Sequence, residues 1–273
     1  MLFYIVGLLC SKLGQYFMSL QNPTLNFQVG NLRNVPLIIK NDDLVRSRVN
    51  NCIEAEKADW DSFETSWDFQ RHPLIRNKAY VALWGDHPPE DHIDSASVEL
   101  SFTRWSQECE SRFQALKRNE EELNRIFIDI YGLQDELTPE VEEKDVTVRR
   151  ADLKRDIRSL ISYAVGCMFG RYSIYEEGLV FAGGEWDYDH YEAAAKQAKA
   201  AEEPLDLYSA ETFLPNRDNI IPITDDEYFA DDIVARFVRF IETVYGKYTL
   251  EENLNYIASA LGGSGSAREV IRN

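Results

Sequence analysis

The chain has 273 residues, of which 44% are hydrophobic and 28% are charged. This length and composition exclude whole-chain disorder and a fibrous repeat, and they leave room for one or two folded domains. The 47 Asp and Glu residues outnumber the 29 Lys and Arg residues, which gives a net charge of −18. Such acidity does not fit a stand-alone nucleic-acid binder, because contacts to phosphate need a local excess of Lys and Arg.

The charge is distributed unevenly along the chain. Residues 1–40 contain Lys12, Arg33 and Lys40 but no acidic residue, so they carry +3 and the remaining residues carry −21. We therefore expect a domain boundary near residue 40. The four cysteines lie far apart and form no C-x-x-C pair. This spacing excludes a zinc ribbon and predicts buried thiols in a reducing cytoplasm.

Both ends of the chain are unusual for a complete domain. Residues 1–10 are almost entirely apolar, but this run is far shorter than the ~20 residues that span a bilayer. The first charge, Lys12, follows the run, whereas a secretory signal has positive charge before it. Residues 262–273 join a Gly/Ser-rich link to the start of an amphipathic helix. We interpret the chain as a fragment of a longer cytoplasmic protein, without a membrane segment.

Two helical periodicities dominate the middle of the chain. Apolar residues recur at helical spacing over residues 41–67, after Asn41 and Asp42 as candidate N-caps, and again over residues 95–130. Two consecutive amphipathic helices can bury their apolar stripes against each other, so we expect a long antiparallel helical arm. The proline-containing connection at residues 68–94 is expected to be loop or extended chain.

A basic cluster follows an acidic linker at residues 133–144. Arg150, Lys154 and Arg158 are four residues apart and would share one face of a helix. One interpretation is a patch that contacts phosphate groups. The other is a solvated helix whose arginines pair with Asp152, Asp156 and the acidic linker, and we favour this second interpretation.

The last third of the chain is expected to be a smaller, mixed α/β part. Residues 159–171 predict a buried helix, with Gly166 and Gly170 allowing close approach of a neighbouring backbone. Residues 178–184 predict a strand or extended segment. Capping boxes at residues 224–227 and 249–252 predict two helices, the first carrying Phe229 and the second ending at Gly262. The overall fold class is therefore mainly α.

No constellation of side chains completes a catalytic site. His87 and His92, with nearby carboxylates, could hold a metal, as could Asp187, Asp189 and His190, but a proline-broken loop holds such ligands poorly. The chain contains no H-E-x-x-H spacing and no P-loop lysine. A metal hydrolase is therefore disfavoured, and the residues alone predict an acidic, mostly helical protein.

Three runs of sequence resemble one family. Residues 8–13 (LLCSKL) and 22–37 (NPTLNFQVGNLRNVPL) resemble the closing segment of target-recognition regions in adenine-specific DNA methyltransferases. Residues 122–139 (ELNRIFIDIYGLQDELTP) resemble the helix that follows this region. Residues 161–172 (ISYAVGCMFGRY), 218–229 and 266–273 complete the pattern in the expected order. Together they resemble PglX, the methyltransferase family of BREX phage-resistance systems.

The resemblance implies a region of an enzyme that methylates adenine N6 in double-stranded DNA with S-adenosylmethionine. The family's catalytic N-P-P-[YFW] motif and Gly-rich cofactor loop are absent, since Asn22-Pro23 precedes Thr24 and Pro88-Pro89 follows His87. No catalytic, cofactor-binding or metal-binding residue is therefore carried over. We expect residues 1–40 to end the target-recognition region, 41–135 to form a helical spacer, 136–158 to form the linker and basic helix start, and 159–273 to form a truncated C-terminal region.

The resemblance also implies a place for DNA contacts. The candidate DNA-binding residues are Asn22, Thr24, Asn26, Gln28, Arg149, Arg150, Lys154 and Arg158. For the first four, the alternative is that Asn22-Pro23 forms a turn that the others support. Other phage-defence proteins are possible partners. The competing hypothesis for the whole chain is an independent acidic, helical protein-interaction module.

Overall fold

A computed structural model describes residues 1–22, 29–81, 95–200, 212–226 and 228–273. The described residues are mainly helical, which confirms the mainly α part of the predicted fold class. None of their helices is both long enough and apolar enough to cross a membrane. By packing, the chain forms two compact units, each built from segments that are distant in sequence. Unit 1 comprises Met1–Asp59 and Cys109–Arg150, and unit 2 comprises Trp60–Glu108 and Ala151–Asn273. The functional boundaries expected at residues 40, 135 and 158 stay predictions.

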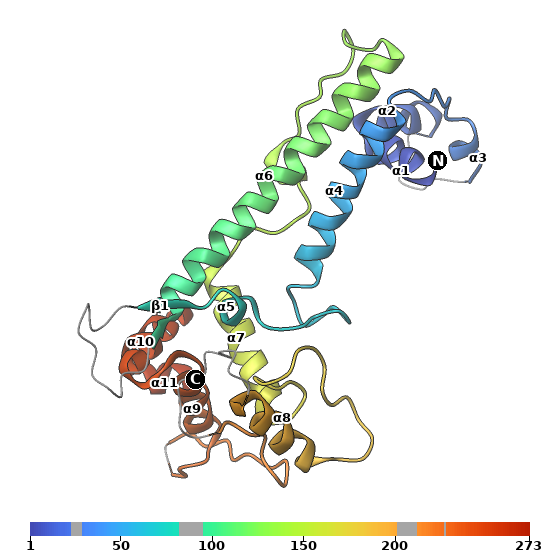
Figure 1. The fold of residues 1–273 in the computed structure, drawn as a ribbon. Coiled ribbons are helices and arrows are strands. Elements are labelled where there is room, and N and C mark those ends of the chain that lie inside the picture. The colour runs from blue at the N-terminus through green and yellow to red at the C-terminus, as the bar shows by residue number, and fades with distance from the viewer. Residues whose placement is uncertain (23–28, 82–94, 201–211, 227) are drawn as a thin grey trace. The chain divides into compact units, whose positions relative to one another are not determined.

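Unit 1 is organised around α6 (Val98–Tyr131), the long helix in Figure 1, which enters this unit at Cys109. The other helices of unit 1 are α1 (Leu2–Cys10), α2 (Lys12–Gln21), α3 (Val29–Arg33), α4 (Asp42–Trp60) and the short 3-10 helix η1 (Glu143–Asp145).

The apolar stripe of α6 forms two clusters in unit 1. In the first, Leu123 and Phe127 pack with Val45 and Val49 of α4 and with residues of α1 and α2. In the second, Phe113 and Leu116 pack with Cys52 and Ala55 of α4 and with three buried valines of the following loop, Val141, Val146 and Val148. Early residues of α4 thus meet late residues of α6, and the two helices run in opposite directions in this unit. Full burial of each such side chain stabilises the fold by about 1.5–3 kcal/mol.

The helix predicted over residues 41–67 is shorter than expected. It begins after Asn41 but ends at Trp60, and Ser66 then donates a hydrogen bond to Asp61 across the following turn (2.6 Å). The Ser66 Oγ also accepts the backbone N–H of Asp68 (3.1 Å), and side-chain bonds to the backbone compete with helical hydrogen bonds. Trp67, assigned to the buried face, is 92% exposed, and Ile53 and Trp60 are also exposed.

Unit 2 contains the first part of α6, a small sheet and a group of helices. Strands β1 (Ala79–Val81) and β2 (Ser95–Ser97) pair antiparallel, with Tyr80 opposite Ala96. The helices are α5 (Pro73–Arg76), α7 (Leu153–Met168), α8 (Tyr188–Ala200), α9 (Ile233–Tyr245), the 3-10 helix η2 (Lys247–Thr249), α10 (Leu250–Leu261) and α11 (Ala267–Arg272).

Aromatic packing and satisfied polar groups hold the core of unit 2. The ring of Tyr163 stacks on Tyr172 at 5.1 Å and meets Phe69 and Phe240 edge-on. His72 is buried beside this group, and its Nδ1 accepts the backbone N–H of Leu74. Burial lowers the pKa of His72 to about 3, so the ring is neutral at physiological pH.

The expectation of a mixed α/β C-terminal part is wrong for the described residues. Beyond residue 159 they contain helices and loops but no strand, and residues 178–184 form a loop with bends at both ends. The close approach of a neighbouring backbone expected at Gly166 and Gly170 is wrong, because the nearest atoms to both glycines belong to side chains. An added Cβ at Gly166 would lie 2.6 Å from Tyr172, and Gly170, at φ +77°, would press against Trp186.

Two predicted helix starts need correction. The helix expected after Thr224 begins only at Ile233, with Asp232 as the N-cap that accepts the N–H of Ala235, so Phe229 lies outside it. Glu227 of that predicted box lies outside the described residues. Thr249 does precede α10, but its hydroxyl donates to the carbonyl of Ala96 and does not cap the helix. The predicted end of α10 at Gly262, in the left-handed conformation, is confirmed.

Candidate nucleic-acid interface

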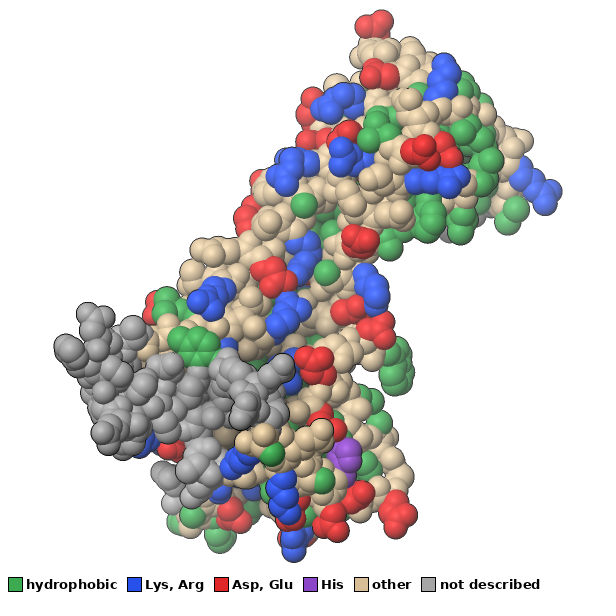
Figure 2. All heavy atoms as spheres, in the orientation of Figure 1, with side chains coloured by type: hydrophobic (Ala, Val, Ile, Leu, Met, Phe, Trp, Pro, Cys, Tyr) green, Lys and Arg blue, Asp and Glu red, His purple; other side chains and the backbone are tan. Residues whose placement is uncertain are grey.

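The polar residues expected to face DNA near the N-terminus are described only in part. Asn22 follows α2, and its backbone N–H donates to the carbonyl of Met18 at 2.9 Å. Thr24, Asn26 and Gln28 lie outside the described residues. Figure 2 shows basic and acidic side chains interspersed over the visible face of the molecule, without a broad basic patch. The role of these four residues therefore stays a prediction.

Arg149 is bound to a buried carboxylate of unit 1. Its backbone N–H and its Nε both donate to Asp59, at 3.2 and 2.9 Å. Asp59 is only 5% exposed. Removing the partner of a buried charge is costly, so this guanidinium primarily fixes the end of α4 to the loop after η1.

Arg150 is held between two carboxylates and an aromatic ring. Its Nε donates to Glu110 at 2.7 Å, its Nη1 donates to Glu143 at 2.9 Å, and its guanidinium lies 3.7 Å from the centre of the Phe113 ring. The hydrogen bonds from Arg150 lower the pKa of both Glu110 and Glu143. A phosphate would have to displace these carboxylates before it could bind Arg150. The predicted pairing of an arginine with the acidic linker is thus observed at this residue.

Lys154 and Arg158 lie in a different setting, on α7 of unit 2. This helix begins at Leu153, where Asp152 caps it by accepting the N–H of Arg155 at 2.7 Å. Arg150 therefore precedes the helix, and the predicted face with three basic residues is wrong. Lys154 and Arg158 remain one turn apart, both are exposed, and neither pairs with any residue that the structure describes.

The opposite face of α7 fixes the direction of these two side chains. Asp156 is 2% exposed and accepts hydrogen bonds from Trp105 Nε1 (3.0 Å), from Arg155 Nε (2.7 Å) and from the backbone N–H of Asp152 (3.1 Å). Ile157 and Leu160 are fully buried on the same side. Because that side is anchored, Lys154 and Arg158 point to solvent, where a phosphate can reach them without displacing an acid.

The proposed metal ligands do not form a site in the part of the chain that is described. Asp187 accepts the backbone N–H of His190, whose Nε2 lies 2.8 Å from Glu176. No cluster of three or more potential metal ligands occurs among the described residues. His87 and His92 lie outside them.

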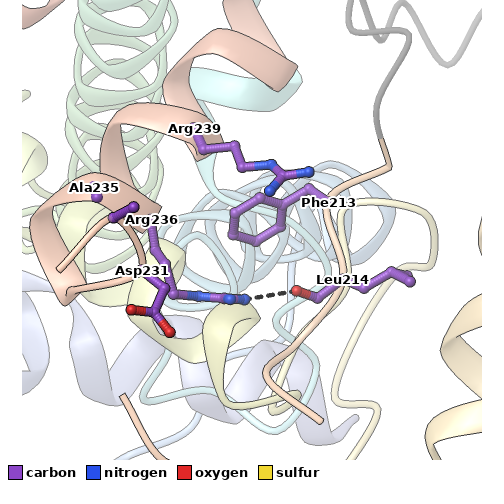
Figure 3. Close-up of a pocket in the computed structure, with 7 residues that line it drawn as sticks. Phe213, Leu214, Asp231, Ala235, Arg236 and Arg239 are labelled. Atoms are coloured by element: carbon purple, nitrogen blue, oxygen red, sulfur yellow. Dashed lines mark hydrogen bonds between the residues drawn. The ribbon is translucent and has the colours of Figure 1, made fainter. Parts of the chain in front are cut away.

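A small cavity in unit 2 was not foreseen from the sequence (Figure 3). It has a volume of about 70 Å³ and is lined by Phe213, Leu214, Ala230, Asp231, Ala235, Arg236 and Arg239. Arg236 donates to the carbonyl of Leu214 at 2.7 Å, and its Nε is buried without a hydrogen-bond partner among the described residues. Burial, together with the nearby charge of Arg239, lowers the pKa of Arg236. Ligand pockets for drug-sized molecules measure roughly 300–1,000 Å³, so this cavity fits a few waters and not a nucleoside. The spacing of Arg236 and Arg239 on α9 was the only sequence signal for it.

Comparison with known proteins provides the context for these observations. No family model matches the chain. The adenine-specific methyltransferase PglX from Lacticaseibacillus casei (strain Zhang) is 43% identical over 274 residues, which cover 99% of this chain. The adenine-specific methyltransferase BrxX from Escherichia coli O9:H4 (strain HS) is 34% identical over 275 residues, which cover 95% of it. This chain is homologous to PglX and BrxX. It spans 20% of the length of each. The resemblance predicted from separate runs of sequence thus extends over nearly the whole chain.

In this PglX homologue, unit 1 contains a cluster of acidic side chains that includes Asp145, the residue after the acidic linker. Glu120 is partly buried near Glu56, Asp145 and Glu121, and burial together with these charges raises its pKa to about 7. Thr147 donates a hydrogen bond to Glu56 within the same cluster. Such a concentration of negative charge repels phosphate and disfavours DNA binding at this part of unit 1.

The acidic cluster predicts a specific pH dependence of stability. Because the folded state holds the Glu120 proton more tightly than the unfolded state, stability falls as pH rises between about 4.5 and 7. Glu120→Gln stays neutral, so it should raise the free energy of unfolding at pH 8, on the order of 1 kcal/mol after allowing for partial exposure, and change little at pH 4. Urea unfolding measured at both pH values tests this.

The control is Glu252→Gln, which changes an exposed carboxylate on α10 of unit 2. This variant should keep the wild-type dependence of stability on pH. Parallel pH profiles for wild type and Glu120→Gln would contradict the assignment.

Proposed function

We propose that this chain is a non-catalytic region of a PglX-type DNA adenine-N6 methyltransferase of a BREX phage-resistance system. In this proposal it supports target recognition and positions other parts of the enzyme, while S-adenosylmethionine binds elsewhere. The observation that carries the proposal is the 43% identity to PglX over 99% of the chain. The absence of an N-P-P-[YFW] motif from its 273 residues supports the non-catalytic role.

The physical demands of the proposed reaction fit a supporting role. An adenine amino group cannot be reached inside the base stack, so the base must be flipped out while the surrounding duplex is held in place. Contacts to phosphates fix the register of a protein on DNA without reading its sequence. Long packed helices such as α4 and α6 can act as a rigid spacer arm between elements that touch DNA. Chromosomal DNA would place this activity in the cytoplasm.

Within this proposal, Lys154 and Arg158 are the strongest candidates for contacts to phosphate. They are exposed, share one face of α7 and have no partner among the described residues. Arg149 and Arg150 are weaker candidates because Asp59, Glu110 and Glu143 already bind them.

A second candidate function is an independent acidic interaction module that binds a protein partner. The net charge of −18 favours it. The carboxylates that bind Arg149 and Arg150 count against it, because they are engaged within the chain and leave less free negative charge for a partner.

A domain exchange tests the first proposal against the second. The L. casei PglX segment that matches this chain is replaced by the 273 residues of this chain, and adenine methylation of chromosomal DNA is measured in cells that carry the remaining BREX genes. We expect methylation at the sites that L. casei PglX modifies, because the transplanted region would preserve the framework of the enzyme.

The control is a chimera in which the segment is replaced by a Gly/Ser linker of equal length, and it should be inactive. A stable but inactive exchange chimera would contradict the proposal and favour the independent module.

The basic face of α7 gives a second test in the same chimera. Lys154→Ala/Arg158→Ala should weaken binding to duplex DNA and reduce the dependence of log Kd on log salt by about two, since each lost phosphate contact lowers the slope by about 0.9. Fluorescence anisotropy over a range of salt concentrations measures both effects.

The matched control is Arg46→Ala/Lys144→Ala, which also removes two charges. Arg46 and Lys144 are ion-paired to Asp42 and Glu142 within unit 1, each at 2.6 Å. The control should retain the wild-type salt slope. Equal slopes for both double variants would rule out phosphate contacts at α7.

A further inference from the structure

Unit 1 exposes an unusual concentration of large apolar side chains. Half of the exposed large apolar side chains found among the described residues lie within residues 1–44. We define the apolar surface of unit 1 as the exposed side chains of Met1 and α1 (Leu2, Phe3, Val6), of the segment after α3 (Leu37, Ile38, Ile39) and of the first turn of α4 (Leu44). Figure 2 shows hydrophobic side chains gathered over this end of unit 1. Exposed apolar side chains that gather in one region are typical of sites of association.

The sequence of α1 explains why this surface exists. The helix contains no charged residue and is apolar on all sides. Tyr4 and Leu8 are buried with Val45, Val49 and Phe127, whereas Leu2, on the outer side, is 71% exposed. A helix that is hydrophobic all round is normally buried on all sides. The outer side of α1 is exposed instead, so no described residue covers it.

Two tyrosines hold the second part of the surface in place. The Tyr4 hydroxyl donates to the carbonyl of Ile38 (2.9 Å) and accepts the backbone N–H of Lys40 (3.2 Å). The Tyr131 hydroxyl donates to the carbonyl of Pro36 (2.6 Å) and accepts the N–H of Ile38 (2.9 Å). These bonds fix the extended segment next to α1 and present Leu37 and Ile39 to solvent. The surface is therefore preformed, which lowers the entropic cost of binding.

The chemistry of the surface argues against DNA as its occupant. Leu, Ile, Phe and Met side chains offer no donor to a phosphate, and DNA-binding interfaces are polar and rich in basic side chains. Residues 1–44, which contain this surface, hold three basic and two acidic side chains, so its edge suits a protein face with an apolar centre and a polar rim of mixed charge.

We propose that the apolar surface of unit 1 is the docking site for the part of a PglX-type methyltransferase that lies outside the matched region. This inference rests on the proposed function. About four fifths of the length of each relative lies outside that region, which is a large enough part of the enzyme to supply an apolar face for this surface. The apolar surface, which lies outside the two buried clusters of unit 1, offers the apolar area that a stable internal interface buries.

Photo-cross-linking in the intact exchange chimera tests this docking site. A photoreactive phenylalanine analogue is placed at Phe3 or at Ile39, and cross-linked peptides are identified by mass spectrometry. We expect cross-links to peptides outside the transplanted segment, in several-fold higher yield than from the control positions Trp67 and Phe229, which are exposed residues of unit 2. Mixing isotopically light and heavy protein distinguishes links within one molecule from links between copies.

Two outcomes would overturn the inference. Links only between copies would identify a second molecule as the occupant, and yields equal to those at Trp67 and Phe229 would show that nothing docks there. If the chimera does not accumulate, the same probes at the aligned positions of L. casei PglX give the same decision. Methylation by the chimera without these cross-links would refute the docking site and leave the proposed function intact. Cross-links without methylation would support the docking site and contradict the proposed function.

Discussion

The apolar stripe of α6 is the constraint on which the rest of the structure depends. A helix of 34 residues with a continuous apolar face is stable in water only when that face is covered. In unit 1, α1, α4 and the valines after η1 cover it. In unit 2, Asp156 accepts the indole N–H of Trp105, and Asn253 accepts the first N–H of the helix at Val98. Val98 and Trp105 of this face are buried in unit 2 as well. Each unit is therefore built around its own part of the stripe.

The features that were predictable from the sequence are those set by local periodicity. The apolar stripe of α6 was predicted because its spacing persists for many turns, and the end of α10 was predicted because Gly262 adopts the left-handed conformation that glycine favours. The end of α4 and the start of α9 were not predictable, because they depend on which of several Ser, Thr and Asp side chains bonds to the backbone. In the candidate site, the shared face of Lys154 and Arg158 followed from their spacing. The binding of Arg149 to Asp59, 90 residues away, could not be predicted from local pattern.

The distribution of charge and apolar surface supports a division of labour within a PglX-type enzyme. In unit 1, Arg149 and Arg150 bind carboxylates, while Leu2, Phe3 and Val6 of α1 are exposed. In unit 2, α7 directs Lys154 and Arg158 to solvent. The two units therefore offer different chemistry, an apolar face suited to protein and a small basic face suited to phosphate. Neither role requires a reactive group, and both follow from the helices that position these side chains.

The central claim is that this chain positions the methyltransferase and does not itself transfer a methyl group. The most direct measurement incubates the purified chain of 273 residues with radiolabelled S-adenosylmethionine and duplex DNA that contains the sites modified by L. casei PglX. Intact L. casei PglX, with the other BREX components if it needs them, serves as the positive control. We predict no transfer of label to adenine by the chain alone under conditions in which the control methylates. Incorporation of label that depends on the chain would contradict the account.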